Sequence, residues 1–158
     1  MPDTATKPAE ILYEVADHVA TITLNAPERM NTISGPMLDE LCEALLKADA
    51  DKDVRCVILT GAGDKAFCAG ADLKNRGDMG PPGQSAGNPF IEILKTLRDG
   101  PKPVICAVNG HTFGGGLGLV AAADIAIGVR GAKFSFSEVR IGVIPAMISV
   151  GVLPVVGP

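Results

Sequence analysis

The sequence predicts an α/β fold with mostly parallel strands, and three observations lead to that prediction. Short apolar runs rich in β-branched residues, which are typical of strands, alternate with segments whose apolar residues recur at helical spacing. Residues 54–60 are nearly all apolar, as expected of a strand that is buried on both faces. Residues 104–108 have the same character, and three consecutive glycines then lead into an apolar run that we expect to form a buried helix.

Composition and charge exclude several classes of function. The 158 residues are 47% hydrophobic, which is enough for the core of one domain. The net charge of −4 provides no basic field for nucleic acid or for an anionic membrane. The four cysteines lack the spacing of a zinc site, and residues 1–7 show no signal-peptide pattern. We therefore expect reduced thiols, no bound metal and a cytoplasmic location.

Local signals in the first half of the chain predict a hairpin, a helix and a loop. Residues 11–16 and 19–24 alternate between apolar and polar side chains around a two-residue turn, which predicts two antiparallel strands. Ser34 precedes Pro36 and an apolar stripe at helical spacing, so a helix should begin there. Residues 75–89 are rich in Gly, Pro, Ser and Asn and predict a mobile loop, a candidate lid.

The second half continues the alternation of helices and strands. Residues 90–97 predict a short amphipathic helix that ends at Gly100, and residues 124–129 predict another apolar strand. Residues 141–158 carry no charge, but three prolines and three glycines argue against a transmembrane helix. We expect a core segment whose covering partner is missing from the chain.

Two segments of small residues are candidate binding sites. The glycines at 114–116 would leave the first free N–H groups of a helix exposed to a ligand oxygen, and the alternative is that close helix–strand packing requires glycine there. Segment 69–73, Ala-Gly-Ala-Asp-Leu, would also expose backbone N–H groups, and its alternative is a plain turn. Dinucleotide binding is rejected because the glycines at 61–63 are not followed by a helix, and no P-loop pattern occurs.

Glu138 is the third candidate. It lies in a largely apolar stretch, and apolar surroundings disfavour an ionised carboxylate, which suits a general acid or base. The alternative is a surface ion pair with Arg140.

Taken together, these motifs resemble the enoyl-CoA hydratase/isomerase (crotonase) superfamily over nearly the whole chain. The resemblance rests on the predicted hairpin, the Ser34 helix and segments 25–31, 69–73, 109–116, 123–125 and 138–145. It implies a spiral of ββα units, with residues 1–158 forming a core that stops before the C-terminal helices that build homotrimers or dimers of trimers. It also implies a cytoplasmic lyase of fatty acid metabolism, which acts on acyl-CoA thioesters without a separate cofactor.

The resemblance assigns roles to individual residues. It implies that the backbone N–H groups of Ala69 and Gly115 form an oxyanion hole for the thioester oxygen, while Glu138 moves the proton. The residues implied to line the CoA moiety are Glu28, Arg29, Ala71, Asp72, Leu73 and Gly114.

One position departs from the pattern of typical hydratases. Those enzymes carry a second catalytic Glu two residues after the glycine triplet, where this chain has Gly118. The first interpretation is an enoyl-CoA hydratase that uses Glu138 alone. The alternatives are an enoyl-CoA Δ3,Δ2-isomerase with a single Glu and an acyl-CoA-binding subunit without turnover. The segment after Glu138 resembles a branch that acts on branched or isoprenoid enoyl-CoAs.

Overall fold

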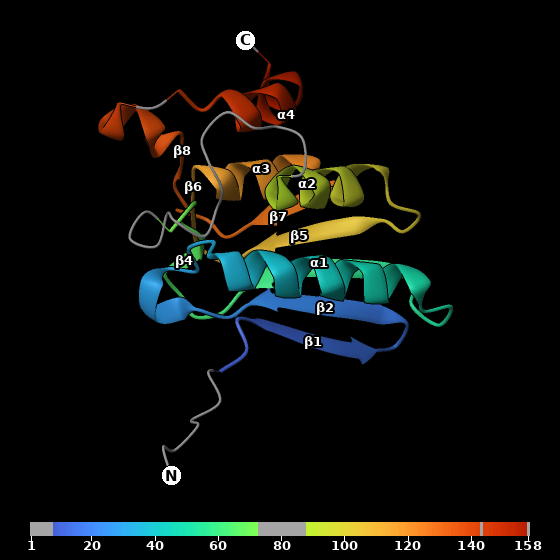
Figure 1. Ribbon diagram of the computed structural model, residues 1–158. Coiled ribbons are helices and arrows are strands. Elements are labelled where there is room, and N and C mark those ends of the chain that lie inside the picture. Colours follow the sequence, from blue (N-terminus) through green and yellow to red (C-terminus); the bar gives the residue numbers. More distant parts are fainter. Residues whose placement is uncertain (1–7, 73–87, 143, 158) are drawn as a thin grey trace.

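The computed structural model describes residues 8–72, 88–142 and 144–157. Figure 1 shows the N-terminal hairpin at the bottom and the C-terminal helix at the top, with the other helices and strands between them. Leu73 and most of the predicted loop 75–89 lie outside the described residues.

The chain begins with the predicted hairpin. Strand β1 (Ile11–Ala16) pairs antiparallel with β2 (Val19–Leu24) along its whole length. The turn consists of Asp17 and His18, which both have left-handed φ values, of 49° and 66°. Two left-handed residues give the turn a twist that matches the twist of the flanking strands.

The hairpin forms one edge of a five-stranded sheet with the order β1-β2-β3-β5-β7, in which every pair after the first is parallel. A second, small sheet has the order β4-β6-β8 and is entirely parallel. The remaining strands are β3 (Cys56–Gly61), β4 (Ala66–Cys68), β5 (Val104–Val108), β6 (His111–Phe113), β7 (Ile125–Gly128) and β8 (Phe134–Ser135). The predicted α/β class with mostly parallel strands is therefore confirmed.

The chain repeats one unit three times after its first helix. Each unit has a strand of the large sheet, a strand of the small sheet and then a helix, as in β3-β4-α2, β5-β6-α3 and β7-β8-α4. This is the expected spiral of ββα units. The helices are α1 (Gly35–Ala50), α2 (Pro89–Asp99), α3 (Gly115–Ala122) and α4 (Ala146–Val156), and the short 3-10 segments are η1 (Pro27–Arg29) and η3 (Ser137–Ile141).

The helices begin and end where local signals indicate. Ser34 caps α1, and its hydroxyl oxygen accepts a hydrogen bond from the N–H of Met37 at 3.1 Å. Asn88 caps α2 in the same way, and Gly100 is its C-terminal cap. Capping side chains therefore confirm both predicted helix starts.

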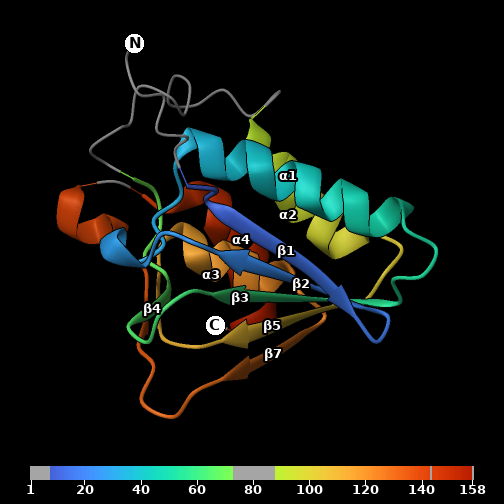
Figure 2. The same cartoon turned by 90° about the horizontal axis from the view of Figure 1, so that it is seen from below.

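The helices cover one face of the large sheet, which Figure 2 shows from the side opposite to them. The alternate residues of β3 that face the helices, Val57 and Leu59, are buried in the main core, whereas Ile58 is only half-buried. The prediction that residues 54–60 are buried on both faces is therefore wrong. The sheet has helices on one side only, so an apolar run does not here indicate two covered faces.

The last unit exposes much apolar surface. Strand β7 is the edge of the large sheet, and Ile127 has an exposed fraction of 63%. Helix α4 contains Pro154, buries Ile148 and Val152, and leaves most of its other large side chains exposed. None of the helices in the described part of the chain has both the length and the apolar character needed to cross a bilayer.

Candidate active site

The three glycines at the start of α3 have different roles. Gly114 is the N-terminal cap and has φ 51° and ψ −122°, a conformation that residues with a side chain rarely adopt. A Cβ atom on Gly116 would lie 2.6 Å from the carbonyl oxygen of Cys68, so the helix and β4 pack too closely for any side chain there. The packing interpretation is therefore correct for Gly116.

Gly115 supplies the backbone donor that the triplet predicted. As the first residue of α3 it has no acceptor one turn back, and no described residue accepts its N–H. A Cβ atom on Gly115 would lie 3.3 Å from Ile33 Cδ1 and 3.4 Å from Phe90 Cζ, so the surroundings are apolar. The positive end of the helix dipole adds to this free donor.

The second expected donor, the N–H of Ala69, is already in use. It donates to the carbonyl oxygen of Met30 at 3.0 Å, so the expectation that Ala69 offers a free N–H is wrong. Gly70 is the physical reason. Its φ of 89° breaks the alternation of an extended chain, and the N–H groups of both Ala69 and Asp72 consequently bond to segment 30–33.

Ala71 has the free N–H instead. Ile33 donates to Gly70 O at 2.8 Å and accepts from Asp72 N–H at 2.9 Å, which turns the N–H of Ala71 to the other side. No acceptor for it is found among the described residues. A Cβ atom on the preceding Gly70 would lie 3.4 Å from the nitrogen of Gly115, so the two loops that carry the free donors are in contact.

Glu138 lies beside these donors. Its Oε1 is 3.0 Å from the point that a Cβ atom of Gly114 would occupy, and its Oε2 is buried with no hydrogen-bond partner in the part of the chain that the structure describes. Arg140 is exposed, and the ion pairs found among the described residues do not join it to Glu138. The surface ion-pair interpretation is therefore wrong. A buried carboxyl oxygen without a partner is costly, so Glu138 remains a candidate functional residue.

The position of the missing second carboxylate is apolar and crowded. A Cβ atom on Gly118 would lie 3.0 Å from Ile148 Cγ2 and 3.5 Å from Leu94 Cδ2 and Phe90 Cζ. Helix α4 thus packs directly over Gly118, and the atoms nearest to it are carbons.

The charged residues expected to line CoA are largely engaged within the chain. Arg29 forms ion pairs with Glu10 and, at 3.7 Å, with Asp72, and its Nη1 also donates to the carbonyl oxygen of Thr32 at 2.6 Å. Glu28 pairs with Arg29 Nε at 3.6 Å, but its side chain stays exposed at the surface. Arg29 and Asp72 therefore hold the N-terminal loop against segment 69–72.

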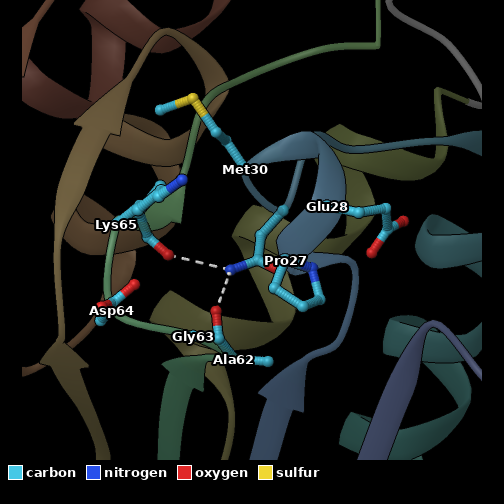
Figure 3. Close-up of a pocket in the computed structure, with 9 residues that line it drawn as sticks. Pro27, Glu28, Met30, Ala62, Gly63, Asp64 and Lys65 are labelled. Carbon is cyan, nitrogen blue, oxygen red and sulfur yellow. Dashed lines mark hydrogen bonds between the residues drawn. The ribbon is translucent and has the colours of Figure 1, made fainter.

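Glu28 lines a hollow of about 280 Å³ between residues 27–31 and 62–66 (Figure 3). Asn31 closes its floor: its amide donates to the carbonyl oxygens of Ala62 and Ala66, both at 2.9 Å, and its Oδ1 accepts from Ala26 N–H at 2.9 Å. Met30 and Asn31 both have left-handed φ values, of 58° and 53°. The residues lining this hollow do not include Gly115, Ala71 or Glu138, so it lies apart from the donors.

A second hollow of about 430 Å³ shares the turn at residues 64 and 65 and contains His111. The Nδ1 of His111 accepts the N–H of Lys133 at 3.1 Å, and its ring stacks on that of Phe113. The imidazole of His111 therefore caps the loop at Lys133. The residues that line this second hollow do not include Glu138.

The cysteines offer no nucleophile near the donors. All four thiols are free, and burial raises the pKa of Cys68 to about 12 and that of Cys106 to about 12. Both thiols are therefore protonated at neutral pH. Among the described residues, no group of three or more His, Cys, Asp or Glu side chains is placed to hold a metal ion.

Comparison with known proteins agrees with this geometry. The family model described as enoyl-CoA hydratase/isomerase matches residues 14–157. The 1,2-epoxyphenylacetyl-CoA isomerase of Escherichia coli (strain K12) is 41% identical over 152 residues, which cover 91% of this chain and 56% of that protein. The (E)-benzylidenesuccinyl-CoA hydratase of Thauera aromatica is 35% identical over 151 residues, which cover 91% of this chain and 56% of that protein.

A solved structure shares the fold. The crystal structure of an enoyl-CoA hydratase from Bacillus anthracis superimposes with a TM-score of 0.83 at 37% identity, and the match covers 92% of this chain and 57% of that one. The chain spans about half the length of the curated relatives it matches. With the family model covering most of its residues, the chain belongs to the enoyl-CoA hydratase/isomerase family.

Proposed function

We propose that this protein is an enoyl-CoA hydratase, which adds water across the C2=C3 bond of a 2-enoyl-CoA thioester. The observation that carries the proposal is the buried, unpartnered Oε2 of Glu138 beside the free N–H groups of the glycine loop. A relative from Thauera aromatica with 35% identity is itself named as a hydratase of a CoA thioester.

The two backbone donors serve the thioester oxygen. As C3 is attacked, negative charge develops on that oxygen, and the N–H groups of Gly115 and Ala71 are free to hold it. The N-terminus of α3 adds its dipole at the same place. Removal of one such donor elsewhere raises the barrier by about 3–4 kcal/mol, so the pair would supply a large part of the catalysis.

Glu138 moves the proton. The oxygen of water bonds to C3 while the carboxylate of Glu138 takes one of the water protons, and the C2=C3 electrons shift to the thioester to give an enolate. The enolate then re-forms the carbonyl group, and C2 takes the proton from Glu138. One carboxyl group thus acts first as base and then as acid, and is unchanged at the end.

The hollow in Figure 3 suits the distal part of a long substrate. It is lined by Glu28 and by the turn that carries Lys65, and Ile33 and Met30 connect its wall to the Ala71 loop. We therefore place the CoA moiety along segment 27–31, with its acyl end at Gly115.

The apolar surroundings of Gly118 favour a second candidate, an enoyl-CoA Δ3,Δ2-isomerase. With only carbons at 3.0–3.5 Å from the Gly118 Cβ position, Glu138 would take a proton from C2 and return it to C4 without any water. A relative with 41% identity is named as an isomerase, although of a different acyl group.

A crotonyl-CoA assay on the complete gene product separates these candidates. Hydration abolishes the absorbance of the conjugated enoyl thioester, whereas isomerisation of a 3-enoyl-CoA creates it. A subunit that only binds acyl-CoA changes neither signal, and that result would refute both catalytic proposals. Branched 2-enoyl-CoAs tested in parallel define the acyl preference.

A further inference from the structure

We propose that the hydroxyl of Ser137 binds the water molecule that Glu138 activates, and that it replaces the missing second carboxylate. This inference rests on the proposed hydratase function. Its geometric basis is the closeness of two side-chain oxygens to the point that a Cβ atom on Gly114 would occupy. Glu138 Oε1 lies 3.0 Å from that point and Ser137 Oγ lies 3.6 Å from it, so both oxygens lie on the same side of Gly114.

The two oxygens can approach this side of residue 114 because it is a glycine. A side chain there would press on Glu138 Oε1, and the left-handed φ of 51° independently disfavours one. Ser137 and Glu138 are consecutive residues of η3, which holds both polar groups against the start of α3.

The reacting water needs a second polar partner. Glu138 accepts only the proton that is transferred, so the other O–H must be held elsewhere for the oxygen to point at C3. On the side of Gly118 the nearest atoms are carbons of Ile148, Leu94 and Phe90, which cannot hold it. The side of Gly114 offers a hydroxyl.

The hydroxyl of Ser137 is available for this role. Three other hydroxyl groups of the chain are engaged: Ser34 caps α1, and Thr112 and Ser149 each donate to a backbone carbonyl oxygen. For Ser137, no hydrogen-bond partner occurs among residues 8–72, 88–142 and 144–157.

The step balances with these groups alone. One proton of the water passes to Glu138, the other O–H donates a hydrogen bond to Ser137 Oγ, and the oxygen bonds to C3. The proton on Glu138 then passes to C2. Ser137 neither gains nor loses a proton, so it affects the addition of water and not the exchange of a proton at C2.

The test compares two reactions of the complete protein. The first is hydration of crotonyl-CoA. The second is exchange of the C2 protons of butyryl-CoA in D₂O, measured by NMR. This exchange needs the oxyanion donors and Glu138, but no water is added to the substrate. Ser137→Ala should lower kcat for hydration about tenfold, the loss expected for one hydrogen bond, and leave KM and the exchange rate unchanged. Ser137→Thr keeps the hydroxyl and should restore hydration.

Ser149→Ala is the matched control, because it removes a hydroxyl that bonds only within α4 and should change neither reaction. Equal losses of hydration and exchange in Ser137→Ala would show a merely structural role and overturn the inference. Unchanged hydration in that variant would overturn it as well, while the hydratase function stood. A wild-type protein that exchanges C2 protons but hydrates nothing would refute the hydratase proposal itself.

Discussion

Replacement of Glu138 by Gln tests the assignment of the proton-moving group. The amide has nearly the shape of the carboxyl group, so it fits the space beside Gly114, where Oε1 lies 3.0 Å from the empty Cβ position. It cannot accept a proton, however, and the two other candidate groups within the described residues are already engaged. His111 is engaged with Lys133, and Asp72 is paired with Arg29.

The expected loss is set by what the carboxyl group does. General acid–base catalysis contributes typically 10²–10⁴-fold, and with Gly118 in place of a second carboxylate the whole contribution falls on one residue. We expect kcat for crotonyl-CoA to fall by about that factor while KM changes little, since the backbone donors of Gly115 and Ala71 remain.

The assay is the decrease of enoyl absorbance under saturating substrate, with Glu92→Gln as control. Glu92 is an exposed carboxylate on α2 that pairs with Lys95 at 2.9 Å, so its replacement removes the same charge at the surface and should leave kcat unchanged. Near wild-type turnover in Glu138→Gln would refute the single-carboxylate mechanism.

Three further predictions follow from the packing and the thiols. Gly118→Glu should not raise hydration and should lower the melting temperature, because even its Cβ atom would lie 3.0 Å from a carbon of α4; a gain in kcat would contradict this. Gly116→Ala should lower the free energy of unfolding in urea titration by about 1–3 kcal/mol, because the new Cβ atom would press on the Cys68 carbonyl oxygen. Gly151→Ala is the control: its Cβ atom would meet nothing within 4 Å, so it should be neutral or stabilising. Because burial raises the pKa values of Cys68 and Cys106, the folded state keeps protons that the unfolded state loses. The free energy of unfolding should therefore fall as pH rises from about 9 towards 12. The expected slope is up to about 1.4 kcal/mol per pH unit for each thiol. Urea midpoints between pH 8 and 10 measure this, and a Cys106→Ala variant should show a shallower decline.

The elements that the sequence predicted well are those with local signals. The hairpin follows from strict alternation around a turn, and α1 follows from a capping side chain before an apolar stripe. Helix α2 follows from its apolar spacing and from Gly100 at its end. The strands of the small sheet were missed, because β6 has three residues and β8 has two, too few to show a period. Burial depended on which face of the sheet the helices cover, and that is a long-range property.

In the site, too, the features with a local sequence signal could be predicted and those set by long-range packing could not. A donor within the glycine triplet could be predicted because the start of an apolar helix exposes its first N–H groups wherever the helix lies, and the family resemblance pointed to Gly115. The choice between Ala69 and Ala71 could not, since it depends on the φ of Gly70 and on which N–H groups segment 30–33 accepts. Ser137 gave no sequence signal at all, because its proposed role depends on its hydroxyl lying beside Gly114 in the folded chain.

The turn at Met30 and Asn31 also bears on the order of folding. Two successive non-glycine residues in the left-handed region cost about 1–2 kcal/mol each, and the bonds that offset this cost reach residues 62, 66 and 69, more than 30 positions away. The local bonds between Ala26 and Asn31 can form early, but the bonds to residues 62, 66 and 69 need β3 and β4 in place. We therefore expect the hairpin and sheet to form before the turn is fixed. An intermediate would then have a formed sheet but no donor loop at Ala71. Pulse-labelling hydrogen exchange at the amides of Ala26 and Ala69 would show them protected last, and early protection of both would contradict this order.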